Sequence, residues 1–542
     1  MADITVFAAK KIITMDPNRP EATHVAVSEG KILAVGGADC ADAWGQVMHD
    51  DSLSDHILMP GFVEGHAHMM AGKMWDFAYA GYHDRIDPKG TLHKGMTTID
   101  EVIARLKERA AALPPGEPLI AWGFDPIFLP SERLNRHHLD DVDADRPIAV
   151  LFSNFHLMCV NSAALELAQY SEQSNIEGVI KGNDGQLTGE LQEMAAMFPV
   201  MRRVGLDFRT LSQGEDALRS YADVCRRAGV TTVTDLYSSM EEEDLDVMLR
   251  VTSTPDFSIR IVPALGATGQ QPEALAARAL ALKAKSTDKL RLGAVKLMTD
   301  GSIQGWTGRV KWPGYVGGQP NGIWNSTPEE IFALCEAMQK HGVQMHIHVN
   351  ADEASEVSLD ACEAAARKHP WPGARHVFQH CQMMGPDQFA RARELGICTN
   401  LFANHIWYFG DQHVALTIGE DRASRMDAVR SALDAGLNVA IHSDAPVTPM
   451  GPLFTAWCAV NRKTMSGRTL GEAQKITVEE ALRLITLGAA FTLKLDDEIG
   501  SIETGKIADF AILGEDPLSV APDALKDVPV LGTVSGGRVL LA

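Results

Sequence analysis

The sequence has no CxxC pair, no long apolar run and a shortage of basic residues. Its eight cysteines are scattered, which favours reduced thiols over a disulfide framework or a zinc knuckle. No stretch of about 18 apolar residues occurs, and no basic segment followed by an apolar one opens the chain, so we expect a cytoplasmic protein. The formal net charge of -22 would repel nucleic acid and anionic membrane surfaces. We therefore expect a soluble globular protein whose partner is a small-molecule substrate.

Strand-like apolar runs alternate with helical segments from about residue 228 onward. The runs are GVTTVTDL, FSIRIVPALG, LGAVKLM, GVQMHIHV, RHVFQHC, GICTNLF and NVAIHSD. Such alternation is typical of β-α units around a parallel sheet. Together with GFVEGHAH at 61–68 these runs make eight strands, the number that closes a (β/α)8 TIM barrel. The predicted fold class is therefore α/β.

Two further regions of the sequence have a pattern of predicted helices and strands that differs from the pattern of the barrel. The interval from about 70 to 228 separates the first predicted strand from the second and contains helices and strands of its own. A structureless loop of that length would be unusual, so we predict an inserted lobe, 70–228, within a barrel domain that spans 61–487. Both chain ends, 1–60 and 488–542, consist of short strands and glycine turns without a helical period.

The first predicted strand ends in two histidines, His66 and His68. Residues two apart on a strand point to the same face, so both imidazoles would face the interior at the rim of the barrel. Two converging imidazoles can bind one divalent ion. A surface pair or a packed pair of histidines would show the same spacing, so this motif alone does not establish a metal site.

Histidines and a carboxylate recur at the ends of other predicted strands, where barrel active sites lie. VQMHIHV contains His346 and His348, RHVFQHC contains His376 and His380, and NVAIHSD ends in Asp444. The member of each histidine pair nearer the strand end would be closer to the site. We therefore predict His348 and His380 as metal ligands, and their deeper partners as core or supporting histidines.

Lys296 lies inside the apolar run LGAVKLM. An ammonium group cannot bind a metal, and burying it unpaired costs several kcal/mol. A neutral amine that adds carbon dioxide becomes a carbamate, an anionic ligand with two oxygens that can bridge two cations. The alternative is a lysine with a buried stem whose head reaches solvent or pairs with Asp300.

Six segments taken together resemble the amidohydrolase superfamily, in its amidohydrolase family 3 branch. They are GFVEGHAH, VKLMTDGS, HVNADEA, RHVFQH, SDAPV and GSIETGKIADFAIL, in this order along nearly the whole chain. The resemblance implies that the two chain ends together form a small composite β-sandwich domain, 1–60 and 488–542. It also implies that VLFSNFHLMCVNSAAL and GQLTGELQE belong to the inserted segment, so that His156 would overhang the active site.

The resemblance implies a binuclear metal centre. Its ligands would be His66, His68, Lys296 as a carbamate formed from carbon dioxide, His348, His380 and Asp444. Two divalent ions, with zinc expected first and manganese, iron or cobalt as alternatives, would activate a bridging water to hydroxide. Asp444 would shuttle the proton to the leaving group, and His156 would hydrogen-bond the developing oxyanion unless it is a structural histidine of the insert.

Three positions differ from the pattern of the family. Ala351 and Asp352 stand where Gly-Asp is common, and Gln379 stands where glutamate is common. His442 stands where glycine is usual, and could support Asp444, act as an extra ligand or narrow the pocket. All the candidate metal ligands are present. Because of these three differences, however, the pKa values of the ligands cannot be inferred from those in the family.

Aromatic residues follow several predicted strand ends, where loops form the substrate walls. The candidate substrate-binding residues are Trp75, Trp306, Phe402 and Trp407, together with His442. We therefore predict hydrolysis of a C–N bond in an amide, formamide or cyclic amide with a bulky apolar substituent. The alternatives are an ester, lactone or carbamate hydrolase, a deaminase, which typically lacks the bridging lysine, and a catalytically silent ligand-binding protein. The resemblance also permits a homodimer.

Overall fold

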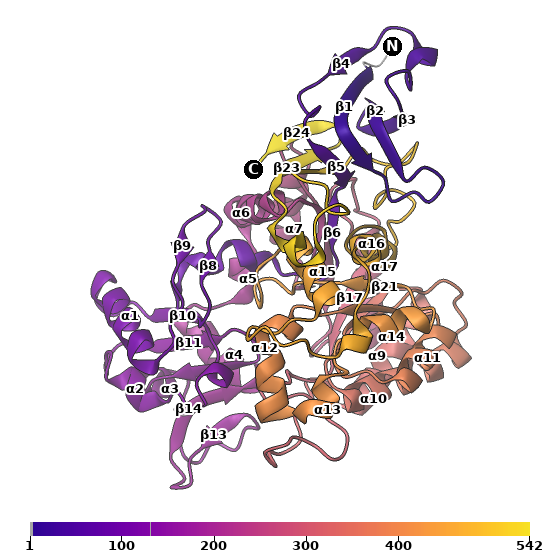
Figure 1. Ribbon diagram of the computed structural model, residues 1–542. Helices are drawn as coiled ribbons and strands as arrows, with labels where there is room; N and C mark the ends of the chain where they lie inside the picture. Colours follow the sequence, from indigo (N-terminus) through magenta and orange to yellow (C-terminus); the bar gives the residue numbers. More distant parts are fainter. Residues whose placement is uncertain (1–3, 131) are drawn as a thin grey trace.

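The computed structural model describes residues 4–130 and 132–542. At its centre, eight parallel strands form one curled sheet in the order β21-β20-β19-β18-β17-β16-β15-β6 (Figure 1). The strands are β6 Phe62–Glu64, β15 Val230–Ser238, β16 Arg260–Gly266, β17 Ala294–Met298, β18 Met345–Val349, β19 Val377–His380, β20 Cys398–Leu401 and β21 Val439–Ile441. Each overlaps one of the apolar runs in which the sequence predicted a barrel strand.

The two edge strands of this sheet, β6 and β21, approach each other just beyond their carboxyl ends. Ala67 and Ala445 form a parallel bridge, and the His68 N–H donates to Ala445 O over 2.8 Å. The Asp444 N–H donates to His66 O over 3.1 Å. The edges therefore meet at the end of the sheet where the predicted ligands lie. Closure along the full length of the strands, which a TIM barrel requires, stays a prediction.

Helices alternate with the strands. They include α6 Gly214–Arg227, α7 Glu242–Thr252, α8 Pro272–Lys283, α9 Pro328–His341, α10 Asp352–Lys368, α11 Pro386–Glu394, α12 His405–Gln412, α14 Val429–Asp434 and α15 Pro452–Asn461. Local signals explain the ends of α9: Thr327 and Glu330 cap each other's backbone, Pro328 occupies the first turn, and Gly342 ends the helix at a φ of 69°. Such helices bury apolar faces against the sheet.

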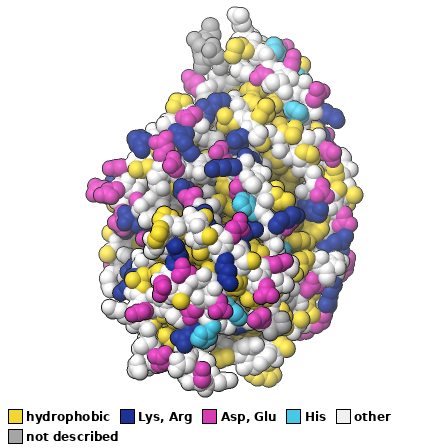
Figure 2. All heavy atoms as spheres, turned by 90° about the vertical axis from the view of Figure 1, so that its left-hand side faces the viewer, with side chains coloured by type: hydrophobic (Ala, Val, Ile, Leu, Met, Phe, Trp, Pro, Cys, Tyr) yellow, Lys and Arg dark blue, Asp and Glu magenta, His cyan; other side chains and the backbone are white. Residues whose placement is uncertain are grey.

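The interval after β6 forms a lobe around a sheet of its own, with strand order β13-β14-β12-β11-β10-β7 (Figure 1). Its strands are β7 Ala78–Tyr79, β10 Leu119–Phe124, β11 Ile148–Phe152, β12 Leu157–Val160, β13 Val179–Lys181 and β14 Leu187–Gln192. Its helices are α1 Ile99–Ala112, α2 Arg136–Asp140, α3 Ser162–Leu167, α4 Glu193–Val204 and α5 Phe208–Leu211. On the face shown in Figure 2, basic and acidic side chains are interspersed.

Strands from both chain ends share a third sheet, with the order β24-β23-β22-β5-β1-β2-β3 and β4 beside β1 (Figure 1). They are β1 Ile4–Ile13, β2 Glu21–Ser28, β3 Lys31–Gly36, β4 Met48–Asp50, β5 Ile57–Pro60, β22 Phe510–Leu513, β23 Val530–Ser535 and β24 Arg538–Leu541. The antiparallel pair β5–β22 joins the two ends of the chain. Because these strands form one sheet, a two-sheet sandwich stays a prediction, as do the domain boundaries.

Two general properties concern the whole described chain. In residues 4–130 and 132–542, no helix is both long and apolar enough to cross a membrane. All eight cysteines are unpaired. The unpaired thiols agree with the prediction from their scattered positions.

Two fully packed histidines should make the fold sensitive to acid. Burial lowers the pKa of His376 and of His413 to about 3. Because these values lie below that of an unfolded histidine, about 6.5, the unfolded chain binds more protons between the two. The contribution of these two neutral histidines to the free energy of unfolding is thus complete above about pH 6.5, and it is lost as the pH falls toward 3. In urea titrations, His413→Gln should reduce the slope of unfolding free energy against pH by up to about 1.4 kcal/mol per pH unit between pH 6 and 4.

The control for this prediction is His137→Gln, because the His137 side chain is largely exposed. This control should keep the slope of the wild type. An unchanged slope in His413→Gln would show that His413 does not contribute to the sensitivity.

Candidate metal centre

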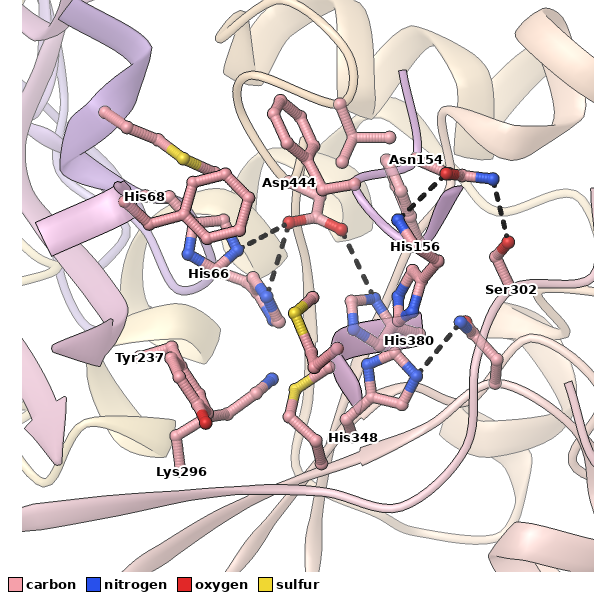
Figure 3. A pocket seen from close by; sticks show the side chains of 18 of the residues that line it. His66, His68, Asn154, His156, Tyr237, Lys296, Ser302, His348, His380 and Asp444 are labelled. Atoms are coloured by element: carbon pink, nitrogen blue, oxygen red, sulfur yellow. Dashed lines mark hydrogen bonds and ion pairs between the residues drawn. The ribbon is translucent and has the colours of Figure 1, made fainter. Parts of the chain in front are cut away.

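Three predicted ligands meet where the edges of the central sheet come together. His66 and His68 follow β6, and Asp444 follows β21 at a φ of 53°, which turns the chain sharply after the strand. Nε2 of each histidine lies 3.3 Å from Asp444 Oδ1 (Figure 3). One ligand atom from each of the three residues lies within 4.8 Å of the other two. Such a set can hold one metal ion.

His380 and His348 lie on the other side of Asp444 (Figure 3). His380 Nδ1 is 3.8 Å from Asp444 Oδ2, and its ring centre is 4.6 Å from that of His348. His348 Nε2 lies 3.2 Å from both Gly301 O and the Asn350 amide nitrogen. The structure thus brings both predicted ligands to the site, with His348 hydrogen-bonded to protein groups.

Lys296 lies at the base of the same cluster and is 1% exposed. Burial lowers the pKa of Lys296 to about 7, although the Asp444 carboxylate acts in the opposite direction. Its Nζ has no hydrogen-bond partner among the described residues. Asp300 accepts instead from three backbone N–H groups, those of Arg309, Asn350 and Ala351. The structure therefore shows neither a solvent-exposed ammonium nor a pair with Asp300.

Gln379 connects the candidate ligands to the layer beneath them. Its Oε1 lies 2.8 Å from His66 Nδ1 and accepts a second hydrogen bond from the Asn400 amide. Its Nε2 lies 2.8 Å from His346 Nδ1. An acceptor at Nδ1 of His66 keeps the lone pair of Nε2 directed at the site. His376 instead bonds Gln339 Oε1 and the Met345 N–H.

His442 lies behind the ligands, fully buried. Its ring stacks on His66 at 4.7 Å and on Phe402 at 4.8 Å. Neither ring nitrogen has a partner among the described residues, and a ligand atom of His442 lies within 4.8 Å of atoms of His66 and His380. His442 is not part of the cavity lining, so the structure places it beside the candidate metal ligands.

His156 reaches the site from the inserted lobe, and a buried carboxylate holds it. Its Nδ1 lies 2.8 Å from Glu193 Oε2, which also accepts from the Asn325 amide over 2.8 Å. Burial alone would lower the pKa of His156, but Glu193 reverses this and raises it above its usual value. His156 lines the cavity, and its ring centre is 5.3 Å from that of His348.

Sequence reasoning missed Glu193, although this residue ends the segment GQLTGELQE. Its φ of 62° is uncommon for a residue with a side chain, and its N–H donates to His156 O over 2.7 Å. A Cβ on Gly301 would lie 2.1 Å from Glu193 Oε1, so the close approach of the lobe requires a glycine at this position. Glu193 and Asn325 thus fix His156 against the end of the central sheet.

A cavity with an empty volume of about 890 Å³, its mouth included, opens onto these residues. Phe402 lines it as predicted, while Trp75 packs on Trp122 and Trp407 packs on Tyr408, both outside the lining. Trp306 also lies outside it. The missed lining residues are Met70, Asn154, Phe155, Met194, Phe198, Phe208, Ser212, Asp235, Tyr237, Met298, Gln304, Asn350, His405 and Val447.

The chain matches the amidohydrolase family over residues 52–541. Protein LONG AFTER FAR-RED 3 of Arabidopsis thaliana is 27% identical, over 98% of this chain and 90% of that protein. The N-substituted formamide deformylase of Arthrobacter pascens is 27% identical, over 99% and 98% of the two chains. A crystal structure of an uncharacterized metal-dependent hydrolase from Pyrococcus horikoshii has the same fold, with a TM-score of 0.71, 22% identity and coverage of 96% and 99%. The resemblance inferred from the motifs is confirmed: the chain belongs to the amidohydrolase family and is a hydrolase.

Proposed function

We propose that the protein is a metal-dependent hydrolase that cleaves the C–N bond of an amide, formamide or cyclic amide with a bulky apolar substituent. One observation carries the metal dependence. Several buried polar atoms at and beneath the candidate ligands lack a hydrogen-bond partner among the described residues. They include Lys296 Nζ, His346 Nε2, His380 Nδ1 and both ring nitrogens of His442. Unpartnered buried groups are costly, and a bound cation would satisfy imidazole nitrogens gathered in this way around a carboxylate.

The chemistry of these side chains fits two divalent ions. Imidazole nitrogens and carboxylate oxygens are the ligands that zinc prefers, and manganese, iron and cobalt also accept them. His66, His68 and Asp444 would hold one ion, and His348 and His380 the other. When bound, the ions would polarise the substrate carbonyl and lower the pKa of a water molecule.

Lys296 would join the two ions as a carbamate. The neutral amine forms an N–C bond to carbon dioxide and releases one proton, which leaves an anion with two ligand oxygens. Burial supports this step, because a pKa of about 7 makes the neutral amine abundant at physiological pH.

Two side chains of the protein would handle protons and charge during hydrolysis. Burial would raise the pKa of Asp444, but its hydrogen bond and charge interaction with His68 lower it, so Asp444 is a carboxylate at neutral pH. Asp444 would accept the proton of the attacking water and pass it to the leaving nitrogen. His156 would donate a hydrogen bond from Nε2 to the developing oxyanion.

Metal removal and a substrate panel test the proposal. Chelation should abolish hydrolysis, and zinc or manganese should restore it, with close to two ions per chain by elemental analysis. The panel contains N-substituted formamides, cyclic amides, N-acyl amino acids, aryl esters and aminated heterocycles. We expect turnover of an uncharged amide or formamide. Turnover of esters or heterocycles alone, or full activity without metal, would contradict the proposal.

A further inference from the structure

We infer that the cavity selects amides whose substituent is apolar and carries no carboxylate, a specificity that rests on the proposed hydrolysis of amides. The inserted lobe contributes four partly or fully buried apolar side chains to the lining, Phe155, Met194, Phe198 and Phe208. These side chains line the same cavity as the candidate metal ligands at the strand ends. A substrate whose carbonyl reaches those ligands would therefore place its substituent against this apolar wall.

The wall offers no cation to an anionic substituent. Among the described residues that line the cavity, Lys296 is the one lysine or arginine, and it lies at the base with the candidate ligands. His156 is compensated by Glu193 at 2.8 Å. A carboxylate placed against the wall would lose its water without gaining a cationic partner, which costs several kcal/mol.

Arginines around the cavity have other partners. Arg85 donates to the backbone oxygens of Pro446 and Val447. Arg133 binds Glu190, with 2.7 Å between Nη2 and Oε1. Arg202 lies on the ring of Phe198, outside the lining, and is exposed to solvent.

The charges that do line the cavity are unfavourable to anions. Asp235 Oδ1 accepts the Met69 N–H over 3.0 Å, while its buried Oδ2 has no partner among the described residues. Asp444 is the second carboxylate in the lining. The net charge of -22 adds a repulsive field during approach. Bound metal ions would be cationic, but their charge acts at the strand ends, where the carbonyl reacts, and not at the wall.

Two formamides with the same reacting group test the inference. N-Phenethylformamide is uncharged, and its para-carboxy derivative differs only by an anionic group on the ring. Assayed with the metal-loaded full-length enzyme for release of formate, the uncharged compound should have a kcat/KM at least about 100-fold higher. Phe198→Arg should narrow this ratio at least about tenfold, with Phe208→Lys as the second variant should the first not fold. Phe332→Arg, on the outer face of α9, should leave the ratio unchanged.

A binding measurement separates this inference from the proposed function. Calorimetry would compare two ketones that cannot be hydrolysed, 4-phenylbutan-2-one and its para-carboxy derivative. If neither formamide is hydrolysed, the proposed hydrolysis of formamides is wrong. Tighter binding of the uncharged ketone would then still support the inferred specificity. Equal kcat/KM values for the formamides, or equal Kd values for the ketones, would overturn it.

Discussion

Replacing Lys296 by alanine should remove at least one divalent ion per chain and lower kcat/KM by at least about a thousandfold. The lysine is fully buried, and its Nζ lacks a partner among the described residues. In the proposed centre the carbamate would be the anion that holds the two ions together, so its loss would leave their mutual repulsion uncompensated. Elemental analysis of protein purified without chelator and steady-state kinetics measure the two effects.

Chemical rescue of Lys296→Ala by a small carboxylate distinguishes the loss of a metal ligand from damage to the fold. Propionate should occupy the space that Lys296→Ala leaves, supply two carboxylate oxygens and restore part of the activity and of the metal content. Lys494→Ala is the matched control, because burial also lowers the pKa of Lys494, to about 8, while its Nζ lies 4.4 Å from the ring centre of Trp371. This control should keep both ions. A Lys296→Ala enzyme that retains two ions and full activity would refute a bridging role.

Glu193→Gln should lower kcat about 100-fold and change KM less than about threefold. The amide keeps the shape of the side chain but removes the charge that fixes His156. Because Glu193 raises the pKa of His156, its loss lowers that pKa. If protonated His156 is the donor, the alkaline limb of the kcat profile should therefore move to lower pH. The measurement is kcat and KM between pH 5 and 10.

Further variants test whether Glu193→Gln acts through the position of His156 or through damage to the fold. Glu190→Gln is the control, since Glu190 is a buried acid three residues before Glu193, in β14, and binds Arg133 instead. This variant should keep the pH profile. His156→Phe combined with Glu193→Gln should be no slower than His156→Phe alone, because Glu193 acts through His156. Additive losses in the double variant would show that Glu193 has another role.

Seven of the eight central strands could be predicted because they are short apolar runs that alternate with helical segments, and the run at 61–68 brought the number to the eight that close a barrel. The gathering of His66, His348, His380 and Asp444 followed from one rule: parallel strands place their carboxyl ends at the same edge. Lys296 stood out because an ionisable residue is conspicuous in an apolar strand. These features depend on local sequence and on a shared strand direction, which require no knowledge of how distant parts pack.

The apolar wall and the Glu193–His156 pair could not be predicted in this way. Phe198 and Phe208 belong to helices of the lobe, and only the packing of the lobe decides which of their faces meets the cavity. Trp75 was predicted to line the cavity because it follows a strand end. It instead packs on Trp122 of the lobe, outside the cavity lining. Glu193 and His156 are joined by an unusual backbone angle and by the close approach at Gly301, neither of which leaves a periodic signal.

The pairing of β5 with β22 has a consequence for how the chain is made. On the ribosome, β1 to β5 emerge first, but the strand that covers the edge of β5 is synthesised only after the entire central sheet. Until then, the N-terminal strands have an open edge that can pair with another chain. Strand β22 therefore covers an edge that is made about 450 residues earlier, and a chain released before β22 is synthesised would leave that edge exposed.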